Sequence, residues 1–143
     1  MSQIVPLISS GTAGPLGVLH LPRLWQKASL EAAGKIAPDY PGCGQGYDQM
    51  VLDGLGLDRD SFLGFVATKP TYVQCEQWVR ENASKLNADS IAALNDSITG
   101  YIHTDETRQE ILDDVGLPDG EPRDAINLNN LDDWNAFHAT VIK

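Results

Sequence analysis

Residues 21–36 read LPRLWQKASLEAAGKI, and this stretch decides the fold class that the sequence indicates. Its apolar residues recur mostly at a spacing of three or four: Leu21, Trp25, Ala28, Ala32 and Ile36. Such spacing is typical of the apolar face of an amphipathic helix. Pro22 suits the first turn, where the amide hydrogen that proline lacks has no partner within the helix. The stretch therefore predicts a helix from about Leu21, with Gly34 weakening its last turn.

The rest of the chain repeats this pattern in shorter pieces that begin after residues favouring a helix start. The expected starts are Tyr47, Asp58, the Thr71-x-x-Gln74 capping box, Asn87, Thr104 and the Asn130-x-x-Asp133 pair. In the last of these helices, we expect the apolar face to comprise Leu131, Trp134, Phe137 or His138, and Val141. Between the helices, glycine and proline mark turns.

No alternating strand pattern of convincing length and no heptad repeat interrupts this reading. We therefore predict an all-α fold, an irregular orthogonal array of about six or seven short helices. Residues 1–18 lack a helical period and are rich in Gly, Pro, Ser and Thr, so we expect an extended arm laid across the domain. The length of 143 residues suits a single domain, residues 1–143.

The net charge of −10 makes some partners unfavourable. Nucleic acid and anionic membrane surfaces attract basic proteins, so neither is expected as a general partner. The charge is uneven, because residues 1–36 carry three basic side chains against one acidic, and residues 101–143 carry ten acidic against three basic. An anionic small molecule could therefore find a favourable field near the first helix.

Several other classes of site and location are disfavoured by the sequence. Cys43 and Cys75 show no Cys-x-x-Cys spacing, and the histidines form no local pair that would seed a zinc site, so two reduced cysteines and no metal are expected. The uncharged first 22 residues lack a basic start, and Pro and Gly interrupt them, which argues against a secretory signal. A cytoplasmic protein is the expectation. The sequence identifies no cofactor and no catalytic residue.

The candidate ligand-binding residues are His20, Arg23 and Lys27, followed by Tyr47 and Asp48. Residues 20, 23 and 27 share one side of a helix, so their heads could converge on a carboxylate or phosphate. Alternatively, this is a solvated helix face. Asp48 could act as a base or orient Arg23, or it could simply favour the positive end of its own helix.

The loop between these two groups contains Gly42, Gly44 and Gly46. Glycines can let the backbone approach a phosphate closely, but this spacing matches neither a dinucleotide fingerprint nor a Walker loop. A simple turn between two helices is the favoured reading. Cys43 lies in the same loop and is read as a bystander thiol, since a reactive thiolate needs nearby positive charge.

Several segments occur together in one known family: residues 19–40, residues 46–48, residues 55–66, the helix containing Trp78, and the Trp134-Asn135 pair. They resemble a bacterial family, domain of unknown function 5069 (DUF5069). Its typical motifs correspond here to Leu21-Pro22-Arg23 with Lys27, Gly34 with Ile36, Tyr40, and Gly46-Tyr47-Asp48. The PGCGQG loop, Gln26 and the elaborate segment 85–128 depart from the family pattern. The resemblance implies a small helical bacterial protein, carries over no mechanism, and draws attention to Arg23, Lys27, Tyr47 and Asp48.

Two functions of different classes remain open at this point. The favoured one is a non-catalytic helical binding or interaction module, in which the polar residues fix the loop to the helix. A protein partner or a second copy would then dock on the acidic C-terminal part. The alternative is a small-molecule-binding protein or enzyme that acts on an anionic metabolite through Arg23 and Lys27.

Overall fold

Seven α-helices and a short π-helical turn form the secondary structure of residues 3–143, the part of the chain that the computed structural model describes. The helices are α1 (Leu21–Ala32), α2 (Tyr47–Leu55), α3 (Arg59–Val66), α4 (Tyr72–Asn82), α5 (Ala88–Thr99), α6 (Asp105–Asp114) and α7 (Ala125–Phe137), and the π-helical turn η1 (His138–Ile142) continues α7. Over the same residues, β-pairing is limited to three isolated bridges. The all-α prediction is confirmed.

The predicted helix starts agree well with the observed caps. Thr71 and Gln74 form the reciprocal capping box at α4, with the Thr71 hydroxyl accepting from the Gln74 amide and the Gln74 side chain accepting from the Thr71 amide. Asp58, Asn87 and Thr104 each accept an amide hydrogen bond from the residue three positions further on. Local sequence therefore determines where these helices begin.

Two predicted boundaries differ from the structure. α1 ends at Ala32, because Gly34 adopts a left-handed φ of 69° that turns the chain out of the helix. Ile36 therefore lies beyond the helix and pairs with Ile4 of the arm. α7 begins at Ala125, several residues before the predicted Asn130-x-x-Asp133 start, because the side chain of Asp124 caps it by accepting from the Asn127 amide.

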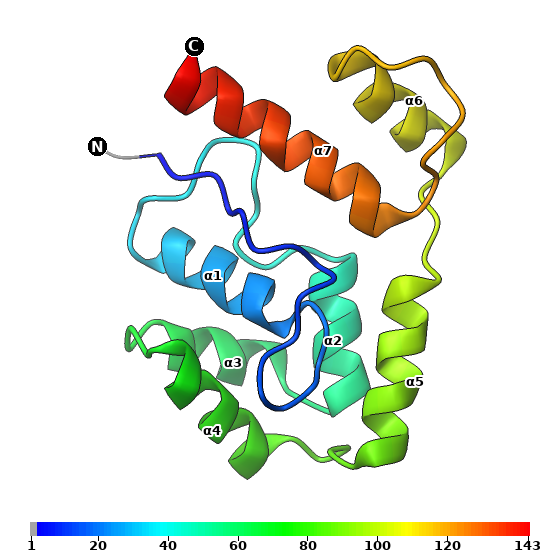
Figure 1. Cartoon of the computed structure of the whole chain (residues 1–143). Coiled ribbons are helices and arrows are strands. Elements are labelled where there is room, and N and C mark those ends of the chain that lie inside the picture. Colours follow the sequence, from blue (N-terminus) through cyan, green and yellow to red (C-terminus); the bar gives the residue numbers. More distant parts are fainter. Residues whose placement is uncertain (1–2) are drawn as a thin grey trace.

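From residue 3 onward, the segment before α1 runs as an extended arm against that helix, as the sequence indicates (Figure 1). Residues 1 and 2 of the expected arm lie outside the described residues. The amide of Ile8 donates to the side chain of Gln26 on α1 at 3.1 Å. Further along, the backbone amide of His20 donates to the carbonyl of Thr12, which closes a tight loop in the arm. The arm thus supplies polar groups that contact the buried side of α1.

The apolar core lies among α1 to α5. The largest fully buried side chains there include Leu24, Leu52, Phe62, Val79 and Ile98, one from each of these helices. α7 packs on α5 and α6, and it crosses above α1 and α2 at the other end of the molecule (Figure 1). Within residues 3–143, none of the helices combines the length and apolar character that crossing a bilayer requires.

Candidate functional site

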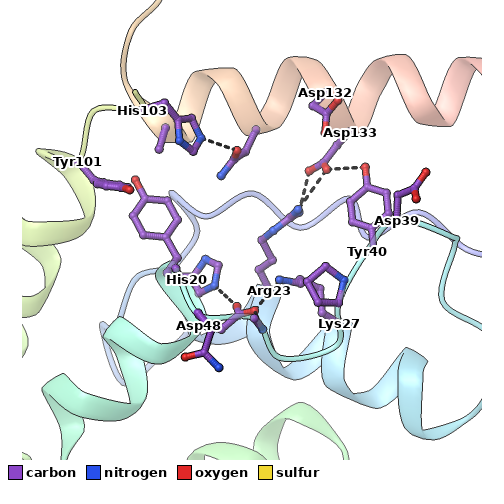
Figure 2. Close-up of a pocket in the computed structure, with 17 residues that line it drawn as sticks. His20, Arg23, Lys27, Asp39, Tyr40, Asp48, Tyr101, His103, Asp132 and Asp133 are labelled. Atoms are coloured by element: carbon purple, nitrogen blue, oxygen red, sulfur yellow. Dashed lines mark hydrogen bonds and ion pairs between the residues drawn. The ribbon is translucent and has the colours of Figure 1, made fainter. Parts of the chain in front are cut away.

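A polar cavity of about 310 Å³ lies where α1, α2 and α7 meet (Figure 2). All five candidate binding residues line it: His20, Arg23, Lys27, Tyr47 and Asp48. The remaining walls come from the 39–46 loop, from Tyr101 and His103 after α5, and from Ala125, Asn129, Asp132 and Asp133 of α7. The fold therefore brings together residues that the sequence singled out in two separate segments.

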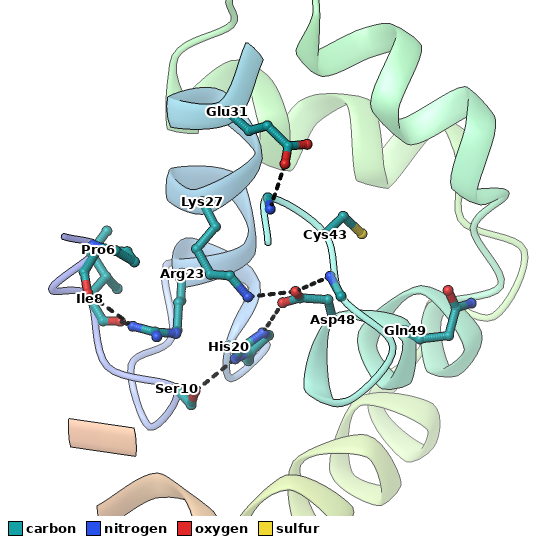
Figure 3. A network of polar contacts seen from close by, with 12 residues as sticks. Pro6, Ile8, Ser10, His20, Arg23, Lys27, Glu31, Cys43, Asp48 and Gln49 are labelled. Atoms are coloured by element: carbon teal, nitrogen blue, oxygen red, sulfur yellow. Dashed lines mark hydrogen bonds and ion pairs between the residues drawn. The ribbon is translucent and has the colours of Figure 1, made fainter. Parts of the chain in front are cut away.

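Asp48 is the centre of the cavity floor, where three donors converge on its buried carboxylate (Figure 3). His20 Nε2 lies 2.6 Å from Oδ1, while Lys27 Nζ and the Gly44 amide donate to Oδ2 at 2.6 and 2.7 Å. Burial opposes ionisation, but the hydrogen bond from His20 and the Lys27 ammonium outweigh it and hold the pKa of Asp48 well below its ordinary value. The carboxylate of Asp48 thus binds Lys27, one of the two cations that the sequence offers as contacts for an external anion.

His20 connects the arm to this floor. Burial lowers the pKa of its imidazole, and the bond to Asp48 only partly opposes that effect, so the ring is neutral near pH 7. Because an ionised Asp48 can only accept, Nε2 carries the proton and Nδ1 accepts from the Ser10 hydroxyl at 2.9 Å. A Ser–His–Asp series results, but Ser10 is buried and does not line the cavity, so its hydroxyl has no route to a substrate there.

Arg23 forms the second buried ion pair of the cavity lining, with Asp133 of α7 rather than with Asp48. Its guanidinium donates to both Asp133 oxygens, at 2.7 and 3.1 Å, and to the arm carbonyls of Pro6 and Ile8. The Tyr40 hydroxyl also donates to Asp133, at 2.9 Å. Burial nevertheless raises the pKa of Asp133 because it outweighs these favourable contacts. This ion pair ties α7 to α1 across 110 positions of sequence.

Charged side chains from α1, α2 and α3 hold the glycine loop, and one of them explains the glycine at position 42. Glu31 accepts from the Gly42 amide at 3.0 Å, and a Cβ at Gly42 would come within 2.6 Å of the Glu31 side chain. Arg59 donates to the carbonyls of Cys43 and Gly44. The Gly42 and Gly44 amides are both taken by carboxylates, so the loop is a fixed turn and not an open phosphate cradle.

The two cysteines are free, and both are buried. Burial raises the pKa of the Cys43 thiol, and the negative charge of Asp48 acts in the same direction. The Cys75 thiol is raised to a pKa of about 12 by burial and by Glu76. Both thiols are therefore protonated near neutral pH, which is the inert form.

One wall of the cavity consists of aromatic rings in series. The ring centroids of His20 and Tyr47 are 5.2 Å apart, those of Tyr47 and Tyr101 are 5.5 Å apart, and those of Tyr101 and His103 are 5.7 Å apart. The Tyr47 hydroxyl donates to the Ile98 carbonyl at 2.6 Å, which fixes this ring in place. The cavity therefore has an aromatic wall beside its charged groups.

The DUF5069 family model, described as a domain of unknown function, matches residues 10–135. The chain belongs to this family. The match spans every residue that lines the cavity, from His20 to Asp133, so the cavity lies within the DUF5069 domain. A comparison with curated proteins found no match.

The α7 side of the site is not among the residues predicted from the sequence. Ala125, Asn129 and Asp133 stand four residues apart, so they share one face of the helix, and all three line the cavity. The sequence contains this four-residue spacing, but a helix predicted to start near Asn130 leaves Ala125 and Asn129 outside it. Over residues 3–143, no group of three or more His, Cys, Asp or Glu side chains is arranged to hold a metal ion.

Proposed function

We propose that this chain is a binding protein for a small polar molecule, which it holds in the cavity between α1, α2 and α7. The proposal rests on one observation: two buried ion pairs, Lys27–Asp48 and Arg23–Asp133, line an accessible cavity. Buried ion pairs contribute little net stability, because desolvation offsets their attraction. Two of them beside one cavity are better accounted for by a need to fix its polar surface.

The state of the floor groups supports binding in preference to catalysis. Both ring nitrogens of His20 are engaged, and Asp48 accepts from three donors. A general base needs a lone pair directed at the substrate, and a nucleophile needs access to it. The floor is therefore suited to recognising a ligand by shape and hydrogen bonds.

The alternative function that the sequence leaves open involves an anionic ligand, with Arg23 and Lys27 as its contacts. An anion would have to compete for these two cations with Asp133 and Asp48, which already hold them at 2.7 and 2.6 Å. The proposal therefore specifies a polar ligand and does not rest on an anion.

Thermal-shift screening tests the proposal with a library of cationic, zwitterionic, neutral and anionic small molecules. A ligand at a hundred times its Kd stabilises a protein by about 2.7 kcal/mol, or roughly 5–10 °C for a chain of this length. Tyr101→Ala removes part of the cavity wall and should reduce the shift. Trp134→Ala removes an exposed aromatic side chain outside the cavity and should preserve it. A library without hits, or equal shifts in both variants, would refute the proposal.

A further inference from the structure

The lining of the cavity contains more acidic side chains than basic ones. Arg23 and Lys27 are its cations, and each is already paired with a carboxylate that also lines the cavity. Two further carboxylates line the cavity, those of Asp39 and Asp132, and neither has an ion-pair partner within residues 3–143. The uncompensated charge of the cavity is therefore negative.

Asp132 is the more informative of these two carboxylates, because it is half-buried on α7. Burial raises its pKa, and the neighbouring carboxylates of Asp133 and Asp114 raise it further. A positive charge placed beside Asp132 would favour its ionised form and so oppose both causes of the raised pKa. Asp39 is exposed and lies at the edge of the cavity, beside Tyr40 (Figure 2).

The aromatic wall supplies the second half of a cation site. A positively charged group is attracted to the face of a tyrosine ring, and more strongly where water is excluded. Tyr40, Tyr47 and Tyr101 line the cavity together with the imidazoles of His20 and His103. In Figure 2, Tyr101 and His103 lie across the cavity from Tyr40 and Asp39, with the α7 carboxylates above.

From the unbalanced carboxylates and the aromatic wall together, we infer that the cavity selects an organic ammonium ion of metabolite size. The ammonium group lies against the Tyr47–Tyr101 wall, and Asp132 supplies its counter-charge. The volume of about 310 Å³ is at the small end of ligand pockets, which run from about 300 to 1,000 Å³. This inference rests on the proposed function and adds the ligand class to it.

Isothermal titration calorimetry at constant ionic strength tests the inference with choline and butylammonium as probes. The neutral isostere of choline, 3,3-dimethylbutan-1-ol, has the same shape without the charge, and succinate tests the opposite charge. We expect at least one ammonium probe to bind, and the neutral isostere and succinate to bind at least tenfold more weakly. Asp132→Asn should weaken ammonium binding at least fivefold. Asp60→Asn removes an exposed carboxylate on α3 and should change it less than twofold.

A second variant keeps the test decisive if Asp132→Asn does not fold, as judged by circular dichroism. Tyr101→Ala, on the partly exposed wall, should also weaken ammonium binding several-fold. The inference is overturned if the isostere or succinate binds as tightly as the ammonium probes, or if the cavity variants bind like Asp60→Asn. If succinate alone binds, the ammonium inference is wrong but the proposed function is retained. If no probe and no library compound binds, both the inference and the proposed function are wrong.

Discussion

Asp48 and Asp133 are the residues on which the interpretation of the site depends. From the sequence, Arg23 and Lys27 are either contacts for an anion or part of a solvated helix face; in the structure both are buried, and each is bound to one of these carboxylates. The residue types and their helical spacing were enough to select the two cations that line the cavity. The pairing of Arg23 with Asp133 could not be predicted, because Asp133 lies 110 positions from Arg23 and only the tertiary fold brings the two together.

Replacing Arg23 by alanine should destabilise the protein strongly. The change leaves Asp133 buried without its cation and also removes a donor from the carbonyls of Pro6 and Ile8. Removing one partner of a buried ion pair typically lowers the free energy of unfolding by about 3–5 kcal/mol. Urea denaturation measures the loss, with Arg123→Ala as the control, since the Arg123–Glu121 pair is exposed and should contribute less than about 1 kcal/mol. Equal losses in the two variants would contradict the buried-pair assignment.

The neutral state of His20 predicts a specific pH dependence. The pKa of His20 is lowered on folding from about 6.5, so below that pH the unfolded chain binds a proton that the folded chain does not. The contribution of His20 to stability is therefore present above about pH 6.5 and is lost as the pH falls. His20→Asn should be less stable at pH 7 and should lose less stability between pH 7 and 5 than the wild type does.

Urea denaturation at a series of pH values measures this slope. Asparagine suits the substitution because it tolerates the left-handed backbone of His20, where φ is 70°. His138→Asn removes an exposed imidazole near the C-terminus and serves as the matched control. An unchanged slope in His20→Asn would mean that His20 is not the group responsible.

At the scale of the helices, local sequence predicts most of the starts. An N-cap depends on a side chain and a backbone amide three residues further on. The helix starts at Asp58, Thr71, Asn87 and Thr104 could therefore be predicted from a few neighbouring residues. α7 is the exception, because Asp124 and the Asn130-x-x-Asp133 pair are both good local caps. Packing decides between them, since Ala125 and Leu128 are buried and the helix must already be formed there.

This choice of cap can be tested directly. Asp124→Ala should lower the free energy of unfolding by about 1 kcal/mol, because it removes the acceptor for the Asn127 amide. Asn130 lies inside α7, so Asn130→Ala should change stability by less than about 0.5 kcal/mol. Chemical denaturation of the two variants measures both values. The reverse order of effects would support the helix start predicted from sequence.

At the scale of the whole molecule, the uneven charge of the sequence takes on a different meaning. The N-terminal 36 residues carry a small positive excess, but Arg23 and Lys27 are buried and paired, so little of it reaches the surface. The acidic C-terminal part supplies Asp132 and Asp133 to the cavity. The fold thus mixes the two regions at one site, which no regional charge count could predict.

The most direct test of the central claim is to locate a ligand on the molecule by nuclear magnetic resonance. Choline is titrated into the isotopically labelled protein while the backbone amide signals are followed. The account predicts shifts concentrated on the cavity residues, including Gly44, Tyr101, Asn129 and Asp132, and the same titration with 3,3-dimethylbutan-1-ol should leave them nearly unchanged. Shifts centred outside the cavity, or equal responses to the two compounds, would contradict it.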